Sequence, residues 1–216
     1  MKLNVLIPTV GLFIGLIFGA QLAQTKTQTQ ALRGNESAGG GGVWYKQNTP
    51  ILVDFFNIDS NFEDTSSFRE WTASQVEVDF QLSLTRANEY EFREQIPALD
   101  LALTIVEKWE QQFLDVTGSH IHSAFMLPMQ WNFSYRKLSA PESYLPLPII
   151  QQSNIKTVAY YESATVDIDI QVWNEAGVIT QAGTFIHEAF RRMQIGWSNR
   201  FDELSLQQAT ALVVMC

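Results

Sequence analysis

The chain contains very little cysteine, and its one cysteine, Cys216, is the last residue. A single thiol cannot form an internal disulfide, so the hydrophobic core alone must stabilise the fold. Basic residues are also scarce, because 14 Lys and Arg stand against 23 Asp and Glu, a net charge of −9. This balance argues against nucleic acid, and against an anionic membrane surface, as the main partner.

Long apolar runs are rare as well, and only one occurs, from Val5 to Ala20, with Lys2 before it. A short positive start followed by such a run is typical of a secretory signal peptide. We therefore expect residues 1–23 to be a signal peptide and the protein to be exported, to the periplasm or the medium. The alternative is an uncleaved anchor, which would be the chain's contact with a membrane.

The residues after the leader divide into a linker and one domain. Residues 24–42 are polar and end in four glycines, Gly39–Gly42, which predicts a flexible linker. Residues 43–216 form the predicted domain, because apolar residues (46%) and aromatic residues (12%) are as frequent as in globular proteins.

Four segments carry strand patterns. Residues 43–45 and 51–56 predict two short strands joined by a turn at 47–50. The strongest strand is expected at 166–173, where apolar and polar residues alternate. Residues 76–84 fit two structures, since their alternation favours a strand while Val76, Phe80 and Leu84 also line one helical face; we predict a helix there.

Three further segments predict helices, at 97–117 with Pro97 in the first turn, at 180–195 and at 202–214. The proline-rich region 120–150 predicts irregular strands and loops. The expected fold class is therefore α+β, a single domain in which a small sheet packs against several helices.

The helix at 180–195 holds the His-Glu pair, His187-Glu188. A core-facing apolar stripe is expected from its residues at three- and four-residue spacing, which are Phe185, Ile186, Ala189, Phe190 and Met193. We expect His187 and Arg191 on a polar strip beside it, and an ion pair between Glu188 and Arg192 on the neighbouring strip.

A zinc peptidase helix carries His-Glu-x-x-His, in which two histidines bind the metal and the glutamate activates water. Here the fifth position is Arg191, which cannot ligate a metal. The candidate catalytic residues are therefore Glu188 as general base, His187, and Arg191, whose guanidinium suits an anionic group. The alternative is a polar helix edge whose His and Arg contact a neighbouring loop.

Candidate metal ligands occur outside this helix. His120 and His122 would point to one side of an extended segment, a spacing that can chelate zinc, and with His187 they are all the histidines of the chain. Asp167 and Asp169 share one face of the predicted strand. One hypothesis is a zinc site of His187, His120, His122 and Asp169. The alternative for His120 and His122 is a polar surface on an edge strand, and the alternative for the two aspartates is the solvated face of a half-buried strand.

Several blocks together resemble a group of exported bacterial proteins found in predatory and related Gram-negative species. The blocks are Gly39–Gly42, Leu52-Val53-Asp54-Phe55-Phe56, Asp169-Ile170-Gln171-Val172-Trp173-Asn174 and Gln181-Ala182-Gly183-Thr184-Phe185-Ile186-His187-Glu188-Ala189. Members have a Gly-Gly start, a Leu-Asp-aromatic strand, and a strand ending in Trp-Asn before a His-Glu-Ala helix. The resemblance implies export and an α+β layout and implies no mechanism. Where members often carry a cysteine, this chain has Ile149 and Ile150.

Two functions follow as hypotheses. The first is an exported bacterial envelope protein with a binding or structural role, whose partner is a protein or a small anionic ligand. The second is a degenerate, zincin-like metal-dependent hydrolase that uses His187 and Glu188. The sequence leaves open which of the two applies, and therefore whether the chain is an enzyme.

Overall fold

The computed structural model describes residues 41–59, 62, 70–117, 121–138, 155–162, 164–196 and 203–215. Residues 37–216 form one compact unit of mixed helices and strands, which confirms the predicted α+β class. The predicted signal peptide and residues 24–40 of the predicted linker lie outside the described residues. Among the described helices, none has both the length and the apolar character that a membrane span requires.

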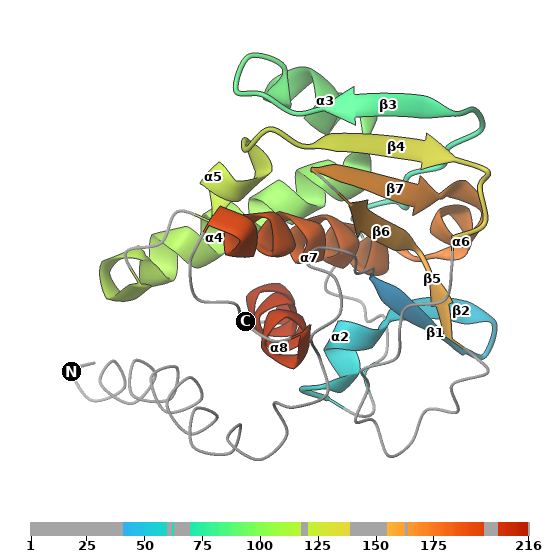
Figure 1. Ribbon diagram of the computed structural model, residues 1–216. Helices are drawn as coiled ribbons and strands as arrows, with labels where there is room; N and C mark the ends of the chain where they lie inside the picture. The colour runs from blue at the N-terminus through green and yellow to red at the C-terminus, as the bar shows by residue number, and fades with distance from the viewer. Residues whose placement is uncertain are drawn as a thin grey trace. The chain divides into compact units, whose positions relative to one another are not determined.

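The elements follow one another along the chain as shown in Figure 1. In order they are β1 (Gly42–Lys46), β2 (Thr49–Leu52), α2 (Val53–Phe56), β3 (Phe80–Ser83), α3 (Glu89–Gln95), α4 (Pro97–Thr117), α5 (His122–Phe125), β4 (Gln130–Ser134), β5 (Ile155–Thr157), β6 (Ala159–Glu162), β7 (Thr165–Asp169), α6 (Ile170–Glu175), α7 (Val178–Gly196) and α8 (Glu203–Met215).

The strands form two sheets. The larger has the order β3-β4-β7-β6, in which β4 and β7 run parallel and the other neighbours antiparallel. The smaller has the order β2-β1-β5 and is antiparallel. Strands β5 and β6 are nearly continuous, so the chain passes from one sheet to the other at Val158.

The predicted hairpin at 43–56 is confirmed in its first part. Strands β1 and β2 pair around Gln47 and Asn48, both with positive φ (51° and 70°), as a two-residue hairpin turn requires. Pro50 lies in β2, an edge strand of the small sheet, where its missing N–H is tolerated. The predicted second strand is wrong beyond Leu52, because Val53–Phe56 is the short helix α2.

Two other strand and helix predictions need correction. The helix favoured for 76–84 is wrong, since Phe80–Ser83 is strand β3 and the alternating pattern prevails. The strand predicted for 166–173 is confirmed only as β7 (Thr165–Asp169), because Ile170–Glu175 is helix α6. Asp169 causes the change, since its carboxylate accepts hydrogen bonds from the backbone N–H groups of Gln171 and Val172 as an N-cap.

The three predicted helices are all present, as α4, α7 and α8. The irregular region predicted after residue 120 contains α5 and β4 in its described part.

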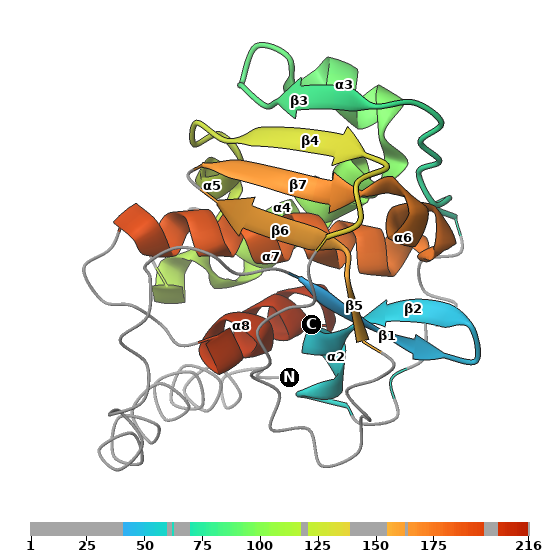
Figure 2. The ribbon, with the colours of Figure 1, turned by 45° about the vertical axis from the view of Figure 1, so that its right-hand side comes forward.

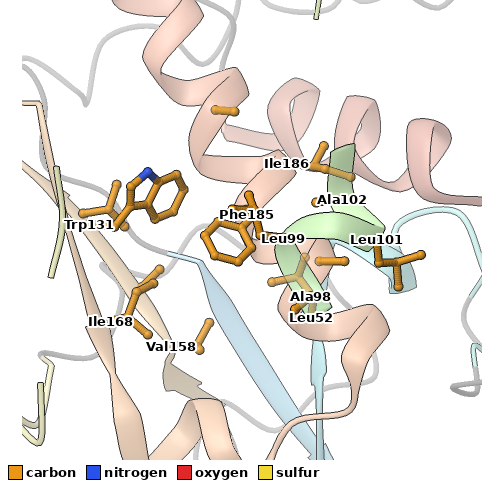
Figure 3. Close-up of a cluster of buried hydrophobic side chains, with 14 of the residues drawn as sticks. Leu52, Ala98, Leu99, Leu101, Ala102, Trp131, Val158, Ile168, Phe185 and Ile186 are labelled. Carbon is orange, nitrogen blue, oxygen red and sulfur yellow. The ribbon is translucent and has the colours of Figure 1, made fainter. Parts of the chain in front are cut away.

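The core lies between the large sheet and helices α4 and α7, which pack against one of its faces (Figures 1 and 2). Phe185 of α7 meets Trp131 of β4 and Trp173 of α6, with ring centroids 4.8 and 5.4 Å apart. Figure 3 shows Phe185 between the sheet residues Trp131 and Ile168 and the α4 residues Leu99 and Ala102. Phe185, Ile186 and Ala189 are fully buried, as the apolar stripe of α7 predicts, while Phe190 and Met193 pack at its margin.

Candidate functional site

His187 lies in the interior of the protein, in contact with two charged side chains. Its imidazole is fully buried, and Nδ1 lies 2.6 Å from Oδ2 of Asp54 in helix α2. On the other side of the ring, Nη2 of Arg191 lies 2.9 Å from Nε2. Both ring nitrogens are thus engaged by protein groups, and the polar strip that the helical pattern predicts for His187 faces the interior of the protein.

Local structure brings Asp54 to this position. Helix α2 begins directly after β2 and places Asp54, completely buried, opposite α7. The backbone N–H of Leu52 donates to Oγ1 of Thr180, which ties the end of β2 to the first turn of α7. One helical turn separates His187 from Arg191, so the guanidinium reaches Nε2 of the ring.

A glycine in α7 permits this close approach. A Cβ added to Gly183 would lie 2.7 Å from Cζ of Phe55 and 3.0 Å from Cδ2 of Leu52, both buried in the core. Real Cβ atoms essentially never come within such a distance, so a larger residue at 183 would push α2 and β2 away from α7.

Glu188 is also completely buried, and its two oxygens contact different parts of the fold. Oε1 accepts a hydrogen bond of 3.2 Å from the backbone N–H of Gly41, and Oε2 lies 3.3 Å from Nε of Arg191. The predicted pair of Glu188 with Arg192 is therefore wrong among the described contacts, because Glu188 faces the interior and pairs with Arg191 three residues on.

The charges around the ring shift the pKa of His187. Burial by itself would lower this pKa, since it disfavours the charged imidazolium. The charge and hydrogen bond of Asp54, aided by the charge of Glu188, outweigh both burial and the opposing charge of Arg191, and they raise the pKa of His187 to about 9. The charged ring is thus favoured at neutral pH.

The contact with Arg191 favours the opposite protonation state. A guanidinium can only donate, so a hydrogen bond from Arg191 to Nε2 requires a neutral ring without a proton on that nitrogen. Two carboxylates against one guanidinium surround His187, and their net negative charge favours the charged ring, which raises its pKa. In the charged form the two donors repel each other, and the carboxylate of Glu188, whose Oε2 lies 3.3 Å from Nε of Arg191, offsets that repulsion.

One buried oxygen beside His187 has no hydrogen-bond donor among the described residues. Oδ1 of Asp54 accepts no hydrogen bond there, although Oδ2 is bonded to His187. A buried carboxylate with a partner at only one oxygen destabilises the fold unless a positive charge lies beside it. We refer to Asp54, His187, Glu188 and Arg191 together as the buried charge cluster.

The predicted zinc set is not assembled by the described residues. Asp169 caps α6 and is 6% exposed, while His122 begins α5 and contacts Glu89, with Nε2 3.0 Å from Oε1. His120 lies outside the described residues. Asp167 accepts a hydrogen bond from Asn132 of the neighbouring strand.

A different set of potential metal ligands surrounds His122. Within the described residues, the group that could hold a metal ion is Glu89, Glu107 and His122, whose ligand atoms lie within 4.8 Å of one another. Nη1 of Arg93 lies 2.7 Å from Glu107 and 3.4 Å from Glu89, and its Nε lies 2.6 Å from Asp100. The guanidinium therefore already lies where a cation would bind and offsets part of the charge of these carboxylates, so a metal ion would have to displace it.

Sequence reasoning found His187, Glu188 and Arg191 but missed Asp54, Glu89 and Glu107. Asp54 carries a signal in retrospect, because it is the single charge in the apolar run Ile51–Phe56. No spacing in the sequence links Glu89 to Glu107 or His122.

No protein-family model, curated protein or solved structure matches the chain. The function must therefore be argued from the geometry of its own residues.

Proposed function

We propose that the chain is an exported envelope protein that acts by binding or scaffolding, and that its His-Glu helix stabilises the fold and has no catalytic role. The observation that carries the proposal is the engagement of both ring nitrogens of His187, by Asp54 and by Arg191. A zinc ligand needs one ring nitrogen free for the metal. Here the nitrogen opposite Asp54 faces a permanent cation.

Glu188 supports the same proposal. A general base must reach a water or substrate atom, but this carboxylate is completely buried and contacts Gly41 and Arg191. Through these contacts the buried charge cluster joins three parts of the fold: the start of the domain, helix α2 and helix α7. The buried charge cluster therefore holds these three parts of the fold in place, as a structural role requires.

The small anionic ligand stays a proposal for the partner, but Arg191 is a weak candidate to bind it. Its side chain is 12% exposed and its nitrogens already face His187 and Glu188.

One observation favours the hydrolase as a second candidate. A carboxylate bonded to Nδ1, such as Asp54 at 2.6 Å, is the arrangement that orients a metal-binding or basic histidine. The hydrolase would use Nε2 of His187 for zinc and Glu188 for water activation. It would require Arg191 to leave the ring.

Zinc content separates the two candidates. Purified protein is incubated with zinc, dialysed and analysed for bound metal, together with His187→Gln and His122→Gln variants. We expect no zinc whose retention depends on His187. Stoichiometric zinc that is lost in His187→Gln would overturn the proposal, whereas zinc lost only in His122→Gln would lie with Glu89 and Glu107.

Export is tested separately. A chain expressed in a Gram-negative host is expected in the periplasmic fraction, with a mass that corresponds to removal of about the first 23 residues, as signal-peptide cleavage predicts. Full-length protein in the cytoplasmic fraction would contradict export.

A further inference from the structure

A second polar cluster lies where three helices meet, and it shares no residue with the buried charge cluster. Helices α3 and α5 both pack on α4 (Figure 1). Glu89 of α3, Glu107 of α4 and His122 of α5 bring their ligand atoms within 4.8 Å of one another. We refer to these three side chains as the helix-junction site. Imidazole and carboxylate groups together are a donor set that binds zinc and other divalent transition metals.

The sequence of α4 explains how this helix presents polar groups to its neighbours. Asp100, Thr104 and Glu107 recur at four- and three-residue spacing, so they lie on one face of the helix. Glu110, one turn after Glu107, accepts a hydrogen bond of 2.7 Å from the backbone N–H of His122. This bond holds the start of α5 against α4 and keeps the imidazole beside the acidic face.

The distances within the helix-junction site are close to those that a zinc ion requires. Zinc bonds of about 2.0–2.2 Å in tetrahedral geometry set neighbouring ligand atoms roughly 3.3 Å apart. Nε2 of His122 lies 3.0 Å from Oε1 of Glu89 and 3.9 Å from Oε1 of Glu107, on either side of that value. Rotation of the side chains would therefore complete the site without movement of the helices.

The charge of this cluster favours a further cation. One guanidinium, that of Arg93, contacts three carboxylates, which belong to Glu89, Asp100 and Glu107. With His122 counted as neutral, the cluster keeps a net charge of −2, which a divalent ion would balance. The contacts of Arg93 also show that a positive charge is already favoured between the two glutamates.

Arg93 has partners that it would keep if a metal ion took its place between the glutamates. It reaches the ligands through Nη1, which lies 2.7 Å from Glu107 and 3.4 Å from Glu89. Its Nε lies 2.6 Å from Asp100, and its Nη2 donates to Thr104. Neither of these two partners belongs to the helix-junction site, so a turn of the guanidinium would admit the ion and leave both hydrogen bonds in place.

Solvent reaches the helix-junction site, in contrast to His187. The side chains of Glu89, Glu107 and His122 are 17%, 38% and 25% exposed, against 1% for His187. A hollow of about 570 Å³ borders the site and is lined in part by Glu89 and Arg93. The hollow gives room for a water molecule as the fourth ligand, which a zinc site with three protein ligands needs.

We propose that the helix-junction site binds one divalent transition-metal ion through Oε1 of Glu89, Oε1 of Glu107 and Nε2 of His122. The ion joins α3, α4 and α5. This inference goes beyond the proposed function and does not depend on it, because a binding protein and a hydrolase could both carry this ion. Zinc bound here is lost in His122→Gln, whereas zinc that contradicts the proposed function is lost in His187→Gln.

The first experiment is a zinc titration of the purified protein in competition with a chromophoric chelator. We expect one equivalent of zinc per chain, and binding that is at least about tenfold weaker in His122→Gln and in Glu107→Gln, because each substitution removes a ligand. The matched control is Glu94→Gln, which removes a negative charge from the same hollow at a residue outside the ligand set. A change within about twofold is expected there, since solvent and salt screen this exposed charge.

Three results of this titration overturn the proposal. The first is the absence of zinc binding, and the second is equal weakening in His122→Gln, Glu107→Gln and Glu94→Gln. The third is zinc that is lost in His187→Gln alone, which also contradicts the proposed function.

The second experiment tests the competition between Arg93 and the ion. Arg93→Gln removes the guanidinium from the two glutamates, so we expect zinc to bind at least about tenfold more tightly. A residue with only a structural role would not produce this gain. Unchanged or weaker binding in a variant that circular dichroism shows to be folded overturns the proposal. If Arg93→Gln does not fold, the titrations of His122→Gln and Glu107→Gln decide.

Discussion

A buried carboxylate destabilises a fold unless a cation or hydrogen-bond donors compensate it. Asp54 has such compensation only through Oδ2 and His187, among the described residues. We expect Asp54→Asn to lower the free energy of unfolding by about 3 kcal/mol, since removal of one member of a buried pair leaves the other without compensation. Urea denaturation measures the change.

The matched control for Asp54→Asn is Glu162→Gln, which also replaces a carboxylate by an amide but at an exposed position. A change within about 0.5 kcal/mol is expected there. Equal effects of the two substitutions would mean that the pair of Asp54 with His187 contributes nothing to stability.

The raised pKa of His187 predicts how stability changes with pH. The folded-state pKa of about 9 lies above the unfolded value of 6.5, so the folded state binds the proton more tightly. The charged His187 therefore adds to the free energy of unfolding, by an amount on the order of a few kcal/mol. This stabilisation is complete below pH 6.5 and is lost as pH rises through about 9. Urea denaturation at a series of pH values measures it, and Asp54→Asn should flatten the profile.

His187 loses its proton at lower pH than Tyr45, whose pKa is raised from 10 by burial and by Glu175. The effects of the two groups on stability therefore fall in different pH ranges. A constant stability between pH 6.5 and 9 would show that His187 is neutral throughout, as a hydrogen bond from Arg191 requires.

At the scale of an element, one capping residue decides where β7 ends and α6 begins. Asp169→Ala should destabilise the protein by about 1 kcal/mol, because two backbone N–H groups of α6 lose their acceptor. Thermal denaturation followed by circular dichroism measures this. Asp169→Ser should restore most of the stability, since serine also caps helices; no rescue would argue for another role of the carboxylate.

Helix α7 and helix α2 approach each other at Gly183. Gly183→Ala by itself should stabilise the helix by about 1 kcal/mol, because alanine favours the helical backbone more than glycine does. The new Cβ, however, would lie 2.7 Å from Cζ of Phe55. We expect the steric conflict to dominate, with a net loss of about 1–3 kcal/mol in urea denaturation. Increased stability would show that Phe55 and Leu52 can move without disturbing the core.

Sequence patterns predicted the three long helices α4, α7 and α8 and the α+β class, because helical periodicity is local information, but they did not predict the shorter helices α2, α3, α5 and α6. They failed at β7 and α6, where alternation continues through Val172 although the backbone changes at Asp169. They also could not predict the buried charge cluster. Asp54 and His187 are 133 residues apart, and only the packing of α2 on α7 brings them together.

At the scale of the whole molecule, residues 37–216 form one compact unit with one continuous core. A chain that begins at Ser37 should therefore unfold in a single cooperative transition. Circular dichroism and tryptophan fluorescence should give coincident urea curves. Separate transitions would show that the two sheets unfold independently.

Gly41 has a mechanical consequence. Its N–H donates to Glu188, and its carbonyl oxygen accepts from the N–H groups of Val158 and Ala159, where the chain passes from one sheet to the other. A tensile force applied through the preceding residues would therefore load these three bonds before it reaches strand β1. Single-molecule pulling from the amino end should thus register rupture at Gly41 as the first event, and Glu188→Gln should lower the force at which it occurs.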